Sequence, residues 1–128
     1  MSEPHRIRLH GPWEIRPHEP GMAAGRMTIP AKLRDGGWPG YKGPISLIRR
    51  FGRPSNLGTN DIVRLAFASV AGAAEILLNG EKLGTMIAAG QFDVTVRLKE
   101  RNEIEVVIQA DDDQSGITGE VALEIVSG

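Results

Sequence analysis

Residues 61–98 decide the fold, and they read DIVRLAFASVAGAAEILLNGEKLGTMIAAGQFDVTVRL. Apolar and polar residues alternate in several runs of this stretch, and the pair Asn79-Gly80 stands between two of them. An Asn-Gly pair between alternating runs is the strongest short-range signal for a β-hairpin, because a type I′ turn needs a positive φ at both central residues. The stretch therefore predicts antiparallel strands on both sides of the turn.

Short alternating runs of the same kind continue along the rest of the chain, separated by segments rich in glycine and proline. The best candidate for a helix is residues 69–80, SVAGAAEILLNG, but Gly72 interrupts it and it ends in the hairpin turn. We therefore interpret it as a loop followed by a strand. About nine short strands with one apolar face each predict an all-β fold, a two-sheet antiparallel β-sandwich. The length suits a single domain over residues 1–128.

One face of each predicted strand carries the apolar residues, and these faces should form the core. Residues 92–98 alternate strictly and predict a strand of their own. Burial of a large apolar side chain contributes about 1.5–3 kcal/mol relative to exposure. A charge at Leu65 or Val106 should therefore be among the most damaging single changes. The predicted inward residues are Val63, Leu65, Phe67, Ile76, Leu78, Val94, Val96, Ile104, Val106, Ile108, Leu123 and Ile125.

The overall charge and the cysteine content exclude several functions. The formal net charge is −1 and the pI is about 6.3, so nothing attracts the chain to nucleic acid or to an anionic membrane surface. The chain has no cysteine, which excludes disulfides, thiolate chemistry and cysteine metal sites. The first residues, MSEPHRIRLHG, lack the apolar segment of a signal peptide, and no run approaches the roughly 18 apolar residues of a membrane helix. We therefore expect a soluble, cytoplasmic protein without a nucleic-acid or membrane partner.

Four segments of the sequence resemble those of a known family, and they occur in the same order. They are residues 48–54, IRRFGRP; residues 63–70, VRLAFASV; residues 74–84, AEILLNGEKLG; and residues 92–106, which begin with FDVT. Together they resemble the N-terminal sugar-binding domain of glycoside hydrolase family 2 enzymes. The resemblance implies a galactose-binding-like jelly roll, which agrees with the β-sandwich that the alternation predicts.

The chain also departs from the family pattern. Leu47 and Ile48 stand where family members usually carry two aromatic residues, and residues 86–90 replace an expected His-x-Gly-Gly loop. The catalytic barrel of those enzymes, which holds their two catalytic carboxylates, is missing from these 128 residues. The resemblance therefore implies a sugar-binding domain that stands alone, and we expect no enzyme activity.

The residue types themselves offer little support for catalysis. Glycoside hydrolysis needs two carboxyl groups about 5–10 Å apart across a cleft, and the 16 acidic residues single out no such pair. The three histidines, His5, His10 and His18, all lie near the N-terminus, and the chain has neither a nucleophile-elbow serine nor a glycine loop for phosphate. We predict no catalytic residue and no cofactor.

The acidic stretch Asp111-Asp112-Asp113 is a candidate calcium site. Its carboxylate oxygens, together with oxygens of Gln114 and Ser115, could serve as ligands for Ca²⁺. It lacks the ligand spacing of an EF-hand loop. A solvated acidic turn is the competing interpretation, and we assign no metal ligand.

Trp38 and Tyr41 are the best ligand-binding candidates. They are two of only six aromatic residues, and both lie in the glycine- and proline-rich loop 34–44. Sugar rings present apolar C–H faces that can stack on aromatic planes, so the loop predicts weak carbohydrate binding. The competing structural interpretation is that Trp38 plugs the end of the sandwich.

Two functions from different classes therefore remain open. The first is a non-catalytic module that binds carbohydrate weakly through Trp38 and Tyr41. The second is a structural or interaction module that self-associates or docks onto a partner protein through an apolar patch. A small hydrolase is the least supported third alternative. Exposed rings at Trp38 and Tyr41 would favour the sugar site, and buried rings would favour the interaction module. The candidate patch residues are Leu47, Ile48, Met86, Ile87, Ala88 and Ala89.

Overall fold

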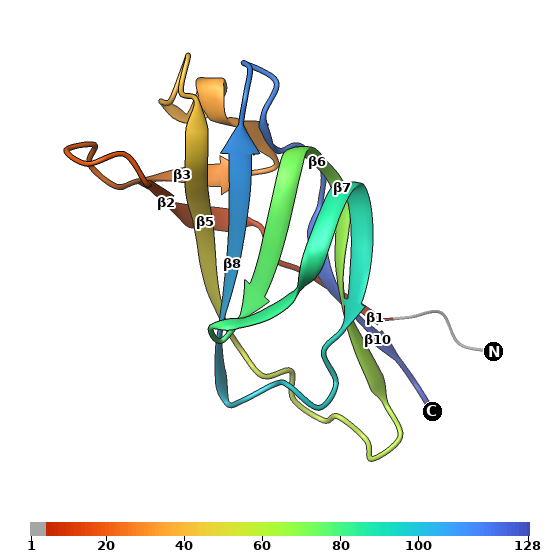
Figure 1. The fold of residues 1–128 in the computed structure, drawn as a ribbon. Coiled ribbons are helices and arrows are strands. Elements are labelled where there is room, and N and C mark those ends of the chain that lie inside the picture. The colour runs from red at the N-terminus through yellow and green to blue at the C-terminus, as the bar shows by residue number, and fades with distance from the viewer. Residues whose placement is uncertain (1–4) are drawn as a thin grey trace.

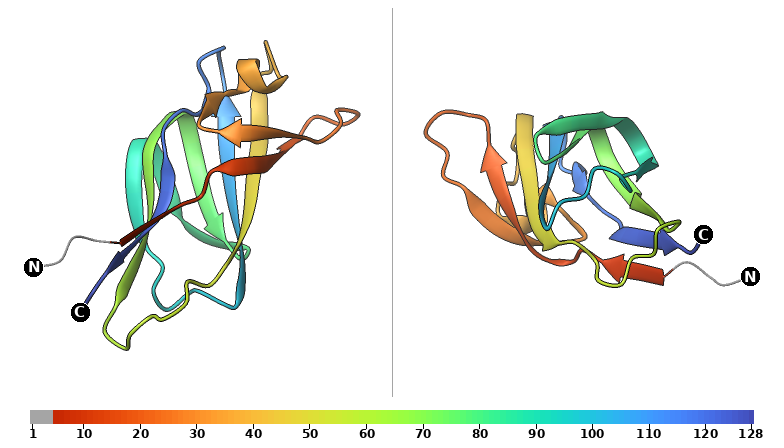
Figure 2. Two further views of the ribbon diagram at one scale, coloured as in Figure 1. Left: turned by 180° about the vertical axis from the view of Figure 1, so that it is seen from behind. Right: turned by 90° about the horizontal axis from the view of Figure 1, so that it is seen from below.

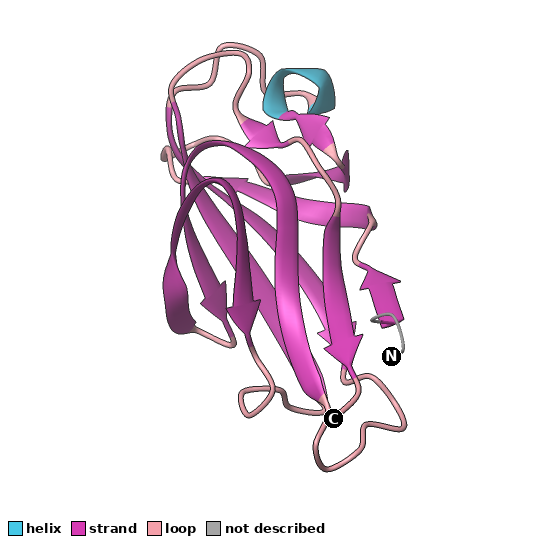
Figure 3. Cartoon of the chain, turned by 90° about the vertical axis from the view of Figure 1, so that its right-hand side faces the viewer, coloured by secondary structure: helices cyan, strands magenta, loops and turns pink. Residues whose placement is uncertain are grey.

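The computed structural model describes residues 5–128, and its regular structure is almost entirely β-strand, as predicted (Figures 1 and 3). Within this range the helical structure is limited to a short 3₁₀ turn, η1, at Leu33–Gly36. The expected lack of a signal peptide rests in part on residues 1–4, which lie outside the described residues. No helix in the described part of the chain is long and apolar enough to cross a membrane. The strands are β1 (His5–Arg8), β2 (Gly11–Pro17), β3 (Gly25–Ile29), β4 (Ala31–Lys32), β5 (Gly43–Gly52), β6 (Ile62–Leu78), β7 (Glu81–Asp93), β8 (Arg101–Ala110), β9 (Gly116–Ile117) and β10 (Val121–Val126).

An antiparallel sheet curls over so that two layers face each other across the core, which confirms the predicted β-sandwich (Figures 1 and 2). The first layer contains β1, β10 and the N-terminal half of β6. The second contains the C-terminal half of β6, followed by β8, β5, β2 and β3. Strand β7 pairs along β6 in both layers, so the β6–β7 hairpin joins them.

The hairpin turn lies where the sequence predicts it, at Asn79-Gly80, with φ values of 53° and 82°. Strand β6, however, continues through the segment 69–73, for which we predicted a loop. The strand bends there, its register with β7 shifts, and Gly72 has a φ of 108°. A Cβ at Gly72 would lie 2.9 Å from Cγ2 of Ile108, so glycine allows the bent strand to lie against β8. The loop prediction is wrong because a bulged strand keeps its hydrogen-bonded partners.

The predicted inward residues are buried, except that Ile125 is half-buried and Val96 is exposed. The two layers meet around large aliphatic side chains and an aromatic pair. The rings of Phe67 and Phe92 pack edge to face, with centroids 6.4 Å apart and planes 78° apart. The hairpin therefore contributes to the core from both of its strands.

Val96 is 95% exposed, so its predicted place in the core is wrong. Strand β7 ends at Asp93, whose carboxylate accepts hydrogen bonds from the backbone N–H of Thr95 at 2.9 Å and from its hydroxyl at 2.7 Å. The N–H of Arg97 then donates to the carbonyl of Val94 at 2.9 Å and closes a turn. Residues 94–98 therefore do not form the predicted strand, because the Asp-x-Thr sequence supplies the side-chain bonds of a turn.

Candidate functional site

Trp38 lies in the loop that follows η1 and is half-buried against the core. Its backbone N–H donates to the carbonyl of Leu33 at 3.1 Å, across Gly37, which has a φ of 115°. A Cβ at Gly25 of β3 would lie only 2.8 Å from Cη2 of the Trp38 ring. The indole therefore packs closely against the backbone of β3, which supports the structural interpretation of this residue.

Tyr41 is 8% exposed, and its hydroxyl donates to the carbonyl of Pro44 at 2.7 Å. Its ring belongs to the buried cluster of the core. Stacking on a sugar needs an open aromatic face, and the burial of this ring works against such a contact. A binding role for Trp38 and Tyr41 therefore remains a prediction.

The same loop does meet the acidic loop that follows β8. The N–H of Gly40 donates to Oδ1 of Asp113 at 3.1 Å. A depression of about 270 Å³ lies between the two loops, lined by Gly40, Tyr41, Lys42 and residues 111–113. Within residues 5–128 no group of three or more histidine, aspartate or glutamate side chains is placed to hold a metal ion.

Hydrogen bonds within the acidic loop account for much of its shape. Oδ1 of Asp112 accepts from the N–H of Gln114 at 2.7 Å. The hydroxyl of Ser115, which is 1% exposed, lies 3.3 Å from both the N–H and Oδ1 of Asp111. Asp111 and Asp112 therefore accept hydrogen bonds from within the loop, as in an ordinary polar turn, and Asp113 accepts one from Gly40.

The structure adds a polar cluster that the sequence did not indicate. The hydroxyl of Ser46 on β5, a residue that is 2% exposed, donates to Oε2 of Glu105 on β8 at 2.6 Å. Nε2 of His18, just after β2, lies 2.7 Å from the same hydroxyl. The serine O–H donates its hydrogen bond to the glutamate and not to the histidine. The histidine is therefore not arranged as a base that would activate the serine. The cluster is therefore a link between β2, β5 and β8 and not a nucleophilic site.

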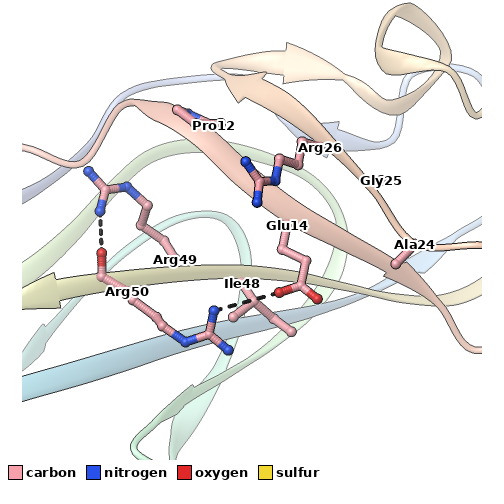
Figure 4. A pocket seen from close by; sticks show the side chains of 8 residues that line it. All are labelled: Pro12, Glu14, Ala24, Gly25, Arg26, Ile48, Arg49 and Arg50. Atoms are coloured by element: carbon pink, nitrogen blue, oxygen red, sulfur yellow. Dashed lines mark hydrogen bonds and ion pairs between the residues drawn. The ribbon is translucent and has the colours of Figure 1, made fainter.

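A larger depression, of about 500 Å³, lies on β2, β3, β5 and the loop before β3 (Figure 4). Three arginines and one glutamate contribute to its wall, and Ile48, which is 5% exposed, supplies an apolar floor. We call it the arginine pocket. Its lining residues are Pro12, Glu14, Ala24, Gly25, Arg26, Ile48, Arg49 and Arg50.

The predicted apolar patch divides into a buried and an exposed part. Residues 47–48 on β5 and Met86 on β7 are buried, so their predicted place on an exposed surface is wrong. Ile87 is 79% exposed, and Ala88 and Ala89 are exposed beside it. Among the strands of residues 5–128, β7 pairs with β6 alone, so this segment lies on a sheet edge. We call residues 87–89 the β7 crest.

No family model matches the sequence, and no curated protein matches it. Solved structures do match. A β-glucuronidase from Bifidobacterium dentium, complexed with coumarin-3-O-glucuronide, is 19% identical, with a TM-score of 0.81 over 98% of this chain and 30% of that chain. A β-glucuronidase from Lactobacillus rhamnosus is 18% identical, with a TM-score of 0.84 over 98% of this chain and 29% of that one. The apo β-glucuronidase from Ruminococcus gnavus is 16% identical, with a TM-score of 0.82 over 98% and 30%.

This chain shares its fold with one part of each enzyme. It spans less than a third of the length of the β-glucuronidase chains that it matches. At sequence identities of 16–19% the likeness concerns the fold alone.

Proposed function

We propose that residues 1–128 form one non-catalytic domain of the glycoside hydrolase family 2 type, and that it acts by docking onto a protein surface. The observation that carries the docking role is the β7 crest, where Ile87 is 79% exposed on a sheet edge. The two rings that could stack on a sugar also favour docking over sugar binding, because Tyr41 is buried and Trp38 packs on β3.

The domain type is supported by two independent observations. Four segments of the sequence resemble those of a family 2 sugar-binding domain and stand in the same order. Its fold matches part of several β-glucuronidases, which belong to the same family, over nearly its whole length. The remaining length of those enzymes has no counterpart in this chain, so we assign their catalysis to that remainder and not to the shared fold.

The β7 crest combines exposure with apolar character over consecutive residues. Burial of a large aliphatic side chain contributes about 1.5–3 kcal/mol, so an exposed isoleucine beside two alanines is an effective contact point. Ala88 has a φ of 73°, which kinks the strand and interrupts its ladder of backbone groups. The contact is therefore made by side chains and not by addition of a strand to the sheet edge.

The partner that binds the β7 crest is a second copy of this chain. When a twofold axis relates two copies of the chain, the same apolar strip of each copy meets the other. A symmetric dimer therefore buries both strips. The strip is small, so we expect a weak dimer with a dissociation constant of about 100 μM.

Sedimentation velocity over about 10 μM to about 1 mM tests this proposal. Ile87→Asp should weaken the dimer at least about tenfold, because it places a carboxylate in each half of the contact. Val96→Asp is the matched control, since Val96 is 95% exposed but stands between the polar residues Thr95 and Arg97. A chain that stays monomeric at every concentration, or a dimer that Ile87→Asp leaves intact, would contradict the docking role.

Weak carbohydrate binding is the second candidate, and the depression between the two loops is the observation that favours it. Tyr41, Lys42 and the carboxylates of residues 111–113 line this depression, and they offer both donors and acceptors for sugar hydroxyl groups. Calorimetric titration with neutral monosaccharides at millimolar concentration tests it. Binding that Lys42→Ala weakens would support a site between the loops, and the absence of any heat of binding would exclude it.

A further inference from the structure

The arginine pocket holds more positive charge than its own carboxylate balances. Three arginines, Arg26, Arg49 and Arg50, line the pocket together with a single carboxylate, that of Glu14 (Figure 4). Glu14 is already engaged, because it forms ion pairs with Arg16 and, at 3.7 Å, with Arg50. In the described part of the chain, no carboxylate lies within ion-pair distance of Arg26 or Arg49. Two positive charges in the pocket therefore lack a partner.

The nearest carboxylates on β8 do not fill this gap. Glu103 binds Nε of Arg50 at 3.2 Å and does not line the pocket. Glu105 accepts a hydrogen bond from the hydroxyl of Ser46 at 2.6 Å and also lies outside the lining. Glu103 therefore balances Arg50, together with Glu14, but neither glutamate of β8 pairs with Arg26 or Arg49.

Arg49 is held in place without losing its charge. Its Nε donates to the backbone carbonyl of His10 at 3.1 Å, and a terminal nitrogen donates to the carbonyl of Arg50. Carbonyl oxygens restrain a guanidinium but do not neutralise it. A side chain that is already restrained loses less conformational entropy when a ligand binds.

Arg26 lines the pocket from a different strand than Arg49 and Arg50 do. It is exposed on β3, whereas the other two arginines lie on β5, and β2 runs between these strands. A group that enters the pocket can therefore be bound from two strands at once. Ile48 provides an apolar floor on which the uncharged part of such a ligand can pack.

We propose that the arginine pocket binds the oxyanion group of a small ligand, that is, a carboxylate, phosphate or sulfate, between Arg26 of β3 and Arg49 of β5. Guanidinium groups suit this chemistry because their forked donors match paired oxygens with charge-assisted hydrogen bonds. The volume of about 500 Å³ is typical of small-molecule sites. The pocket and the β7 crest lie toward opposite edges of the second layer, so ligand binding and dimer formation are separate properties.

Nuclear magnetic resonance titration of the ¹⁵N-labelled chain with inorganic phosphate, sulfate and acetate, at constant ionic strength, tests the proposal. We expect saturable shifts of the amide signals of residues 24–26 and 48–50, with a dissociation constant of about 1 mM for the best anion. Stronger binding of acetate would identify a carboxylate ligand. Stronger binding of phosphate or sulfate would identify a tetrahedral one.

Arg26→Gln should lower the affinity for the best anion at least about tenfold, because it removes a charge and its forked donors. Arg26→Lys, which restores the charge without the fork, should give intermediate binding. Arg34→Gln is the matched control, since Arg34 is an exposed arginine of η1 outside the pocket, and it should bind as the wild type does. Shifts that do not saturate, or an affinity that Arg26→Gln and Arg34→Gln change equally, would overturn the proposal.

Discussion

The side-chain amide of Asn79 donates to Oδ1 of Asn102 at 3.1 Å, which joins the hairpin turn to the start of β8. The carbonyl oxygen of the Asn79 side chain also accepts from the N–H of Glu103 at 2.9 Å. Asn102 is 3% exposed, and its side chain bonds both the N–H and the carbonyl of Lys99. Asn79 therefore has two roles: it adopts the positive φ of the turn, and it fixes the start of β8.

Asn79→Gly separates these two roles, because glycine keeps the positive φ and loses the side-chain hydrogen bonds. We expect the free energy of unfolding to fall by about 1–3 kcal/mol, since two hydrogen bonds disappear and Oδ1 of the buried Asn102 loses a donor. Urea unfolding followed by circular dichroism measures this change. Asn56→Gly is the matched control: Asn56 has a φ of 61° but is exposed, and its replacement should change the stability by less than about 0.5 kcal/mol. Equal effects of the two substitutions would contradict the second role.

The fold could be predicted from the sequence wherever a local signal decides the structure. The Asn79-Gly80 pair specifies its own turn, and strict alternation places Val106 and its neighbours in the core. The prediction failed at 69–73, where a bulged strand bends around Gly72 and keeps its partners. It also failed at Val96, where the side chain of Asp93 ends the strand although the alternation continues.

The candidate sites were harder to predict, because they depend on residues that are distant in the sequence. His18 and Ser46 are 28 residues apart, and Ser46 and Glu105 are 59 apart, yet one hydroxyl joins all three. The arginine pocket likewise combines residues 12–26 with residues 48–50. Without the register of β2, β3 and β5, no pattern in the sequence brings these side chains together. The aromatic residues Trp38 and Tyr41 could not be assigned from the sequence, because composition alone does not separate stacking on a ligand from packing on the backbone.

A methyl group at Gly25 should disturb the packing of Trp38. A Cβ there would lie 2.8 Å and 2.9 Å from two atoms of the indole, which is closer than van der Waals contact. We expect Gly25→Ala to lower the free energy of unfolding by about 1–3 kcal/mol, as overpacking does elsewhere. Thermal or urea unfolding measures the loss.

Trp38→Phe provides the control for this contact, because the smaller ring leaves room for the added methyl group. In a double-mutant cycle, Gly25→Ala should cost at least about 0.5 kcal/mol less in the Trp38→Phe background than in the wild type. Purely additive effects would show that the indole does not press on β3.

Ser46→Ala should destabilise the link between β2, β5 and β8. The substitution leaves Oε2 of Glu105 without its hydroxyl donor in a partly buried place, at a cost of about 1–3 kcal/mol. Unfolding in urea at neutral pH measures the change. Ser55→Ala is the control, since Ser55 is exposed in the loop after β5 and should tolerate the change within about 0.5 kcal/mol. Indistinguishable stabilities of the two variants would contradict a structural role for the cluster.

Val106 and Val96 offer a direct comparison of a buried and an exposed valine. Val106 is 0% exposed and Val96 is 95% exposed. Val106→Asp should cost more than about 3 kcal/mol or prevent folding, because the core offers no partner for a carboxylate. Val96→Asp should stay within about 0.5 kcal/mol of the wild type in the same unfolding experiment. A large loss at Val96 would mean that residues 94–98 pack as a strand after all.

The carboxylate of Asp93 should make the turn after β7 sensitive to acid. The pKa of Asp93 lies below its ordinary value, chiefly because the Thr95 hydroxyl and then the Thr95 N–H donate to the charged form, with a smaller contribution from Arg64. A lowered pKa in the folded state means that the contribution to stability is complete above the unfolded pKa of about 3.9 and disappears as the pH falls through the folded value. The stability advantage of the wild type over Asp93→Asn should therefore be largest at neutral pH and vanish in strong acid, as measured by urea unfolding along a pH series. Thr95→Val should raise the pKa of Asp93 toward its ordinary value in a carboxyl NMR titration, and an unchanged pKa would contradict the assigned cause.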